Sequence, residues 1–235
     1  TDAVRLGMLA EIAEDGYTVL PGVLDPTAVA RCCTGLADVF AVEDDIADVR
    51  QWRTAAYRVA YMLPAKHPTF LDLCRPGPLV TLAAVVLGDD CVFAGLNGMV
   101  MRPGGTGQPL HRDHPHPTPG TTLMLHAVVA LDPFSVANGA TRLVPGSHRD
   151  VTTTVTDDDA RYVELAPGDA VVYDAACMHG GSANGTATDR RALHVLFTRR
   201  WVQPHWDFPG SLRPDDAATL DDERRRLLGF GNVPA

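Results

Sequence analysis

The chain has 235 residues, with 20 basic and 29 acidic side chains and a net charge of −9, which argues against nucleic acid or an anionic membrane as its main partner. Hydrophobic residues make up 46% of the sequence, as in an ordinary globular core, and no apolar run approaches the ~20 residues that a membrane span needs. The first residues show no basic segment followed by an apolar one, so we expect no secretory signal.

The first 90 residues predict a largely helical region. Asp25 and Pro26 are a helix N-cap and a proline at the first helical position, so a helix is expected from there to about residue 40. The other elements expected in this region are a helix over 2–14, strands over 17–20 and 56–63, and two short helices, the second of which ends at residue 87.

From residue 91 onward, short apolar stretches alternate with Gly and Pro. Many short strands at near-regular spacing predict a mainly β fold, a double-stranded β-helix (cupin-like jelly roll) with the helices packed outside. The expected strands cover residues 92–102, 121–131, 140–144, 162–165, 170–173 and 191–201. Residues 215–228 predict one final helix. We therefore expect a single domain over 1–235, with a helical part at 1–90, a jelly-roll core at 91–201 and a C-terminal helix.

The segment 109–117 reads Pro-Leu-His-Arg-Asp-His-Pro-His-Pro. On an extended strand alternate side chains share a face, so His111 and Asp113 point the same way and Arg112 points away. An imidazole beside a carboxylate forms two-thirds of a 2-His-1-carboxylate facial triad, which holds non-haem Fe(II) and leaves the opposite face open. A hydrogen-bonded His/Asp pair without metal, or a zinc site made of histidines alone, is the alternative interpretation.

Three further features follow the HxD motif in order. Residues 138–148 read Asn-Gly-Ala-Thr-Arg-Leu-Val-Pro-Gly-Ser-His, His179 lies in Met-His-Gly-Gly after a turn and a strand, and Arg190 comes eleven residues later. Over about residues 98–201 this set resembles the phytanoyl-CoA dioxygenase family of Fe(II)/2-oxoglutarate oxygenases. That family has an HxD, an intervening N-G…P-G-S-H segment, a distal His and an Arg eleven residues beyond it.

The resemblance implies that His111, Asp113 and His179 hold Fe(II), and that Arg190 binds the far carboxylate of 2-oxoglutarate, with O2 as oxidant. A guanidinium offers a planar fork of donors that matches a carboxylate. The family commonly has a hydroxyl residue two places after the distal His, but here that position is Gly181. Thr141 or Ser182 is therefore expected to supply the missing hydrogen bond. Ligating histidines must be neutral, so metal affinity should fall as the pH drops through ~6.5.

For a short chain of this composition, the resemblance implies a bacterial enzyme that tailors natural products. We expect oxidation of an unactivated C–H bond of a small polar substrate, such as a sugar-containing antibiotic, by hydroxylation or oxidative ring closure. Ordinary packing or hydrogen bonding is the alternative role for the candidate substrate contacts, which are Asn97, His114, His116, His126 and His194.

Two other functional classes remain open from the sequence. One is a non-catalytic cupin-like binding module, and the other is a metal-dependent hydrolase or isomerase in the same barrel. Neither would need 2-oxoglutarate. The five cysteines are odd in number and lack CxxC spacing, so free thiols in a reducing cytoplasm are expected. The sequence does not indicate an oligomeric state.

Overall fold

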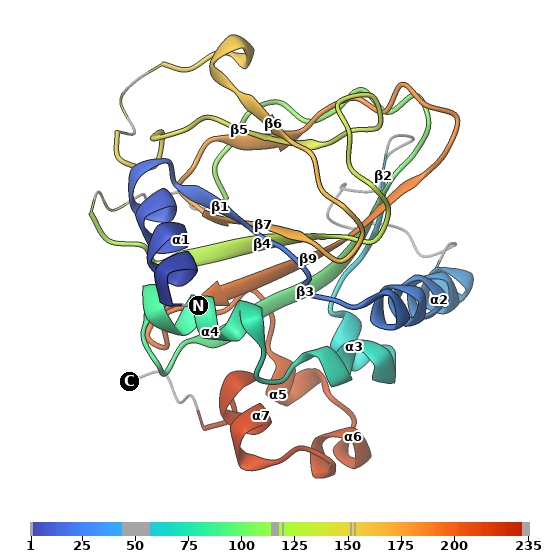
Figure 1. The fold of residues 1–235 in the computed structure, drawn as a ribbon. Helices are drawn as coiled ribbons and strands as arrows, with labels where there is room; N and C mark the ends of the chain where they lie inside the picture. The colour runs from blue at the N-terminus through green and yellow to red at the C-terminus, as the bar shows by residue number, and fades with distance from the viewer. Residues whose placement is uncertain are drawn as a thin grey trace.

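The computed structural model describes residues 2–43, 57–113, 118, 120–150, 152 and 154–231. Two antiparallel sheets face each other, as Figure 1 shows, in agreement with the predicted jelly roll. The larger sheet has the order β1 (Tyr17–Leu20), β7 (Ala170–Asp174), β4 (Met124–Ala130), β9 (Arg190–Thr198), β3 (Val92–Met101) and β2 (Tyr57–Ala60). The smaller sheet has the order β6 (Arg161–Val163), β5 (Thr141–Leu143) and β8 (His179–Gly181).

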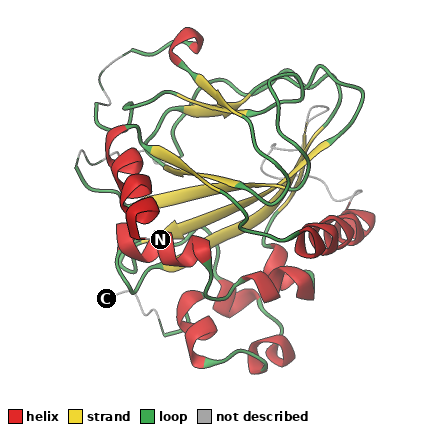
Figure 2. Ribbon diagram, in the orientation of Figure 1, coloured by secondary structure: helices red, strands yellow, loops and turns green. Residues whose placement is uncertain are grey.

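Helices cover the outer face of the larger sheet, and the smaller sheet faces its inner side (Figure 2). The helices are α1 (Asp2–Glu14), α2 (Pro26–Glu43), α3 (Pro68–Leu73), α4 (Pro78–Leu87), α5 (Phe208–Ser211), α6 (Pro214–Ala218) and α7 (Asp222–Leu227), with short 3-10 turns at Leu63–Ala65 and Asp157–Asp159. Among the described residues, no helix combines the length and hydropathy that crossing a bilayer requires.

Strand β9 shows how the two faces of the larger sheet differ. Leu193, Val195 and Phe197 belong to the core cluster that includes the helices, whereas Ala192 packs in the cluster between the two sheets. Because side chains alternate along a strand, Arg190 shares the inner face with Ala192. A strand buried on both faces is a nearly continuous apolar run, and all seven residues of β4 are buried.

The N-terminal region folds largely as the sequence predicts. The side chain of Asp25 caps α2, with its Oδ1 accepting from the N–H of Ala28 at 2.7 Å. The expected strand over 56–63 is shorter, because β2 ends at Ala60 and Met62 adopts a left-handed conformation with φ 55°. A left-handed residue cannot continue a strand.

The expected single helix over 215–228 is wrong, because the structure has α6 and α7 in its place. The carboxylate of Asp221 accepts from the N–H of Arg224 at 2.8 Å and starts a new helix. The break lets Leu220, which is 7% exposed, enter the core. The arginines of α7 bind carbonyl oxygens elsewhere: Arg224 donates to Leu71 O at 2.7 Å, near the C-terminal end of α3, where a cation is favoured.

Candidate metal and co-substrate site

His111, Asp113 and His179 converge at one point between the sheets. Their ligand atoms all lie within 4.8 Å of one another, with Asp113 Oδ1 3.7 Å from His111 Nε2 and Asp113 Oδ2 3.4 Å from His179 Nε2. The backbones of the two histidines pair directly, each N–H donating to the other's carbonyl at 2.9 Å. Ligand atoms about 2.1 Å from one metal ion at right angles lie about 3 Å apart, so this set fits a metal.

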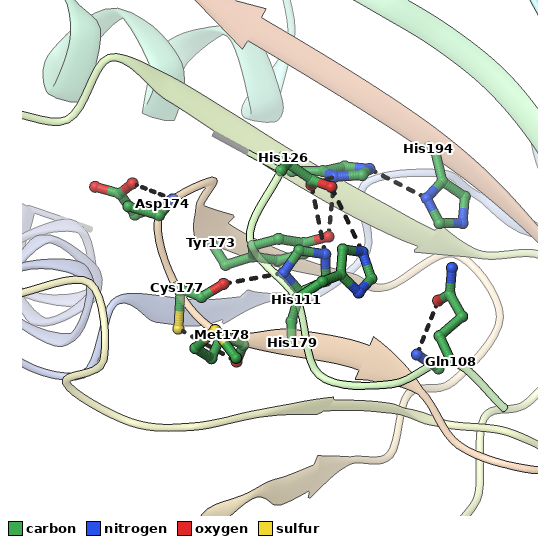
Figure 3. A network of polar contacts seen from close by, with 12 residues as sticks. Gln108, His111, His126, Tyr173, Asp174, Cys177, Met178, His179 and His194 are labelled. Atoms are coloured by element: carbon green, nitrogen blue, oxygen red, sulfur yellow. Dashed lines mark hydrogen bonds and ion pairs between the residues drawn. The ribbon is translucent and has the colours of Figure 1, made fainter. Parts of the chain in front are cut away.

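Backbone carbonyls orient both imidazoles. Nδ1 of His111 donates to Pro109 O at 3.0 Å, and Nδ1 of His179 donates to Cys177 O at 3.0 Å, as Figure 3 shows. Because a carbonyl only accepts, these contacts leave each Nε2 with a free lone pair facing Asp113, as in metal-ligating histidines. Burial lowers the pKa of His179 to about 4, so this ring is neutral at pH 7.

Asp113 is held by a second set of side chains. Its Oδ2 lies 2.6 Å from Nδ1 of His126, which also lies 2.9 Å from the hydroxyl of Tyr173. Nε2 of His126 lies 3.1 Å from Nδ1 of His194. Burial opposes ionisation of Asp113, but the three neighbouring histidines, His126 foremost, hold its pKa well below the usual range. The carboxylate is therefore ready to bind a cation.

Arg190 and Arg191 are adjacent in sequence and point to opposite faces of β9. Arg191 makes a bidentate ion pair with Asp132 at 2.6 and 2.8 Å. Arg190 is 2% exposed, its guanidinium stacks 4.2 Å from the ring of Phe134, and its Nε has no hydrogen-bond partner within the described part of the chain. Burial lowers the pKa of Arg190 to about 10, so it stays charged at neutral pH. An anionic ligand is the partner that this arrangement lacks.

A cavity of about 320 Å³ joins the metal cluster to Arg190. Its wall includes four of the other residues singled out from the sequence, namely Asn97, His126, Thr141 and His194. Ser182 is not among the lining residues, because its hydroxyl donates to Ala140 O at 2.9 Å. His114 and His116 lie outside the described residues.

His126 and Asn97 lie in the cavity wall, and each also has hydrogen-bond partners within the protein. Both ring nitrogens of His126 are engaged, by Asp113 and by His194. The side-chain oxygen of Asn97 accepts from Met62 N and from Trp206 Nε1, each at 3.0 Å. Asn97 therefore fixes Trp206 in the cavity wall.

Sequence reasoning missed several lining residues, among them Tyr61, Gln108, Tyr173, His205 and Trp206. Gln108 lies three residues before His111, and its Oε1 accepts from the N–H of Gly181 at 3.0 Å. Trp206 lies eight residues beyond the end of β9 and is carried back by a backbone hydrogen bond to Ala94 O. No local pattern marks these positions, since only the fold brings them to the cavity.

Comparison with known proteins gives consistent matches. The dioxygenase penM of Penicillium thymicola, described as iron/alpha-ketoglutarate-dependent, is 38% identical over 128 residues, which are 49% of this chain and 40% of penM. The structure of SnoN, a non-heme alpha ketoglutarate dependent epimerase from nogalamycin biosynthesis, matches with a TM-score of 0.72 and 22% identity over 95% of this chain and 91% of SnoN. HygX of Streptomyces hygroscopicus matches with a TM-score of 0.72 and 18% identity, over 84% of this chain and 88% of HygX.

The chain spans about half the length of the curated relatives that it matches at 30% identity or more. The two solved structures share its fold. The model of the phytanoyl-CoA dioxygenase (PhyH) family matches residues 12–192, which is most of the chain. The protein therefore belongs to the phytanoyl-CoA dioxygenase family.

Proposed function

We propose that the protein is an Fe(II)/2-oxoglutarate-dependent oxygenase that oxidises a C–H bond of a small polar natural product. The observation that carries this proposal is the pairing of a three-donor cluster with a buried guanidinium across one cavity, whose Nε has no hydrogen-bond partner among the described residues. A metal-dependent hydrolase would need the cluster but would leave Arg190 without a partner. A dicarboxylate co-substrate accounts for both features.

Each residue has a separable task in the proposed reaction. His111 and His179 offer Nε2 lone pairs and Asp113 offers a carboxylate, while His126 holds that carboxylate in place. Arg190 binds the distal carboxylate of 2-oxoglutarate, and Val128 and Leu196 in the cavity wall help to exclude water. When bound, Fe(II), 2-oxoglutarate and O2 supply the oxidising equivalents for a two-electron oxidation, with succinate and CO2 as co-products.

The polar side of the cavity supports a polar substrate. Nε2 of His194 is buried and has no hydrogen-bond partner among the described residues, and His205 contributes a further imidazole to the wall. SnoN has been solved with Fe3+, alpha ketoglutarate and nogalamycin RO, and HygX with nickel, 2-oxoglutarate and hygromycin B. These precedents support an antibiotic-like substrate. The five free cysteines support a reducing, cytoplasmic setting.

Anaerobic titration tests the proposal directly. Adding Fe(II) and then 2-oxoglutarate should give a weak visible charge-transfer band, and Asp113→Ala should abolish it. Arg190→Ala should weaken 2-oxoglutarate binding about 100-fold or more, because removing one partner of a buried charge pair costs ~3–5 kcal/mol. Arg191→Ala is the matched control, since its guanidinium points to Asp132 outside the cavity, and it should leave 2-oxoglutarate affinity unchanged.

Two results would contradict the proposal. If iron binds and no band develops with 2-oxoglutarate, a binding module or a metal-dependent hydrolase or isomerase becomes the better interpretation. If Arg190→Ala and Arg191→Ala bind 2-oxoglutarate equally well, the anchor is another residue.

A further inference from the structure

Two buried polar groups have no hydrogen-bond partner within the described residues: Nε of Arg190, which lines the cavity, and the hydroxyl of Tyr57, which lies near the wall residue Gly181. Buried polar groups are nearly always paired, so an unpaired one in a native fold calls for a ligand or an ordered water. The two groups also interact electrostatically, because the charge of Arg190 lowers the pKa of Tyr57. Two such groups that act on one another, one cationic and one a hydroxyl, indicate one missing anion.

The strand register places both side chains on the inner face of the larger sheet. Tyr57 on β2 pairs with Met101 on β3, and Met101 pairs with Arg190 on β9. Side chains of directly opposed residues lie on the same face of a sheet. The three residues therefore form one row across neighbouring strands, with the fully buried Met101 between the two polar groups.

The hydroxyl of Tyr57 reaches across to the smaller sheet. It lies 3.9 Å from the point where a Cβ on Gly181 would stand, and Gly181 is part of the cavity wall. Gly181 cannot donate a hydrogen bond from a side chain. A Cβ there would meet the end of Met101 at 3.3 Å and Gln108 Oε1 at 3.4 Å, both flexible atoms.

We propose that Tyr57 donates a hydrogen bond to the distal carboxylate of 2-oxoglutarate beside Arg190, and so supplies from β2 the hydroxyl that Gly181 lacks. This inference rests on the proposed function. Burial is the main influence on the pKa of Tyr57 and raises it, so the phenol stays protonated at neutral pH and can donate. Tyr57 acts on the co-substrate alone and has no contact with the metal ligands in this arrangement.

Tyr57→Phe removes only the hydroxyl and keeps the ring. Anaerobic titration of the Fe(II) protein should show 2-oxoglutarate binding weakened about tenfold or more, as for the loss of a hydrogen bond to a charged group. Fe(II) affinity and the melting temperature of the metal-free protein should not change. Tyr162→Phe is the control, because Tyr162 is 44% exposed on β6, and it should bind 2-oxoglutarate like the parent protein.

A second ligand tests whether the effect of Tyr57→Phe depends on the distal carboxylate. 2-Oxovalerate has the same 2-oxo acid group but ends in a methyl group, so Tyr57→Phe should not alter its affinity. Adding Gly181→Ser to Tyr57→Phe should recover much of the lost 2-oxoglutarate affinity, because the serine hydroxyl would stand near the vacated position.

Three outcomes would overturn the inference. Unchanged 2-oxoglutarate affinity in Tyr57→Phe would overturn it while the proposed function stands, provided that Arg190→Ala still weakens binding. If Tyr57→Phe weakened 2-oxovalerate binding as much as 2-oxoglutarate binding, Tyr57 would maintain the general shape of the site and would not act on the distal carboxylate. No charge-transfer band in the parent protein would overturn the proposed function and this inference together.

Discussion

At the scale of single residues, Asp113 lies at the centre of the site, and neighbouring side chains fix its orientation. Asp113 lies against His126, and His126 lies against both Tyr173 and His194. A carboxylate oxygen only accepts, so Nδ1 of His126 carries a proton, and in the neutral ring Nε2 accepts from Nδ1 of His194. This chain fixes the tautomers of both rings and gives Asp113 a single orientation.

We expect His126→Phe to weaken Fe(II) binding by 10- to 100-fold, the usual effect of removing a hydrogen-bond partner of a metal ligand. The measurement is an anaerobic metal titration of the purified apoprotein. His194→Phe leaves the contact between His126 and Asp113 in place, so its effect on metal affinity should be smaller. Equal losses in the two variants would show that the contact with Asp113 has no special role.

The residues that sequence reasoning found and missed differ in a physical way. Strand alternation predicted that His111 and Asp113 share a face, and the resemblance to the dioxygenase family indicated His179 and Arg190. The face of His126 could also be predicted, but its partner could not, since Asp113 comes from a separate segment. No sequence pattern indicated Tyr57, because its place in the row with Arg190 depends on the pairing of β2 with β3.

At the scale of elements, α2 packs on the larger sheet at a point where the sheet has no side chain. A Cβ on Gly98 in β3 would overlap Cδ1 of Leu36 and lie 3.3 Å from Leu63. Leu36 is 1% exposed. Glycine therefore allows the close approach of helix and strand, in a backbone conformation that any residue can adopt.

Gly98→Ala should lower the free energy of unfolding by about 1–3 kcal/mol, the usual cost of overpacking a core. Leu36→Ala alone should cost about 2–5 kcal/mol through the cavity that it leaves. The double variant should be more stable than the sum of the two losses predicts, since the added methyl occupies part of that cavity. Urea unfolding of the three variants measures this coupling, and strict additivity would contradict the assigned contact.

The sequence predicted most elements, and two of those that it misjudged have local reasons. Strand β8 contains Gly180 and Gly181, which have low strand propensity, and it exists because β5 and the backbone of His111 pair with it. The two acidic clusters at Asp215 and Asp221 were read as one helix. Each cluster lies at the start of its own helix. The cap that Asp221 forms on α7 separates the two helices, although the apolar periodicity had indicated one.

At the scale of the whole molecule, the five cysteines are distributed through the fold without any disulfide. Cys33 is partly exposed and the other four are buried. Burial raises the pKa of Cys32 and Cys74 to about 12, and that of Cys91 and Cys177 to about 11. The thiolate is the reactive form, so these four side chains should be inert in the native protein.

At pH 8 a thiol-specific reagent should label Cys33 of the native protein much faster than the other four cysteines, because its side chain is partly exposed, although burial raises its pKa as well. Raising the pH from 7 to 9 should not bring the four buried thiols into the rapid phase, because their pKa values stay well above that range. All five should react once the protein is unfolded in urea. Rapid labelling of a second cysteine under native conditions, located by peptide mass, would contradict the burial described above.

The segment that follows β9 has a consequence for how the protein can evolve. Trp206 packs against Tyr61 at 5.6 Å between ring centroids and hydrogen-bonds to Asn97, whereas the three candidate metal ligands come from residues 111–179. Part of the cavity wall and the candidate metal ligands are thus encoded in separate stretches of the chain. Mutation and recombination after residue 200 can reshape that part of the wall while the candidate metal ligands are inherited intact.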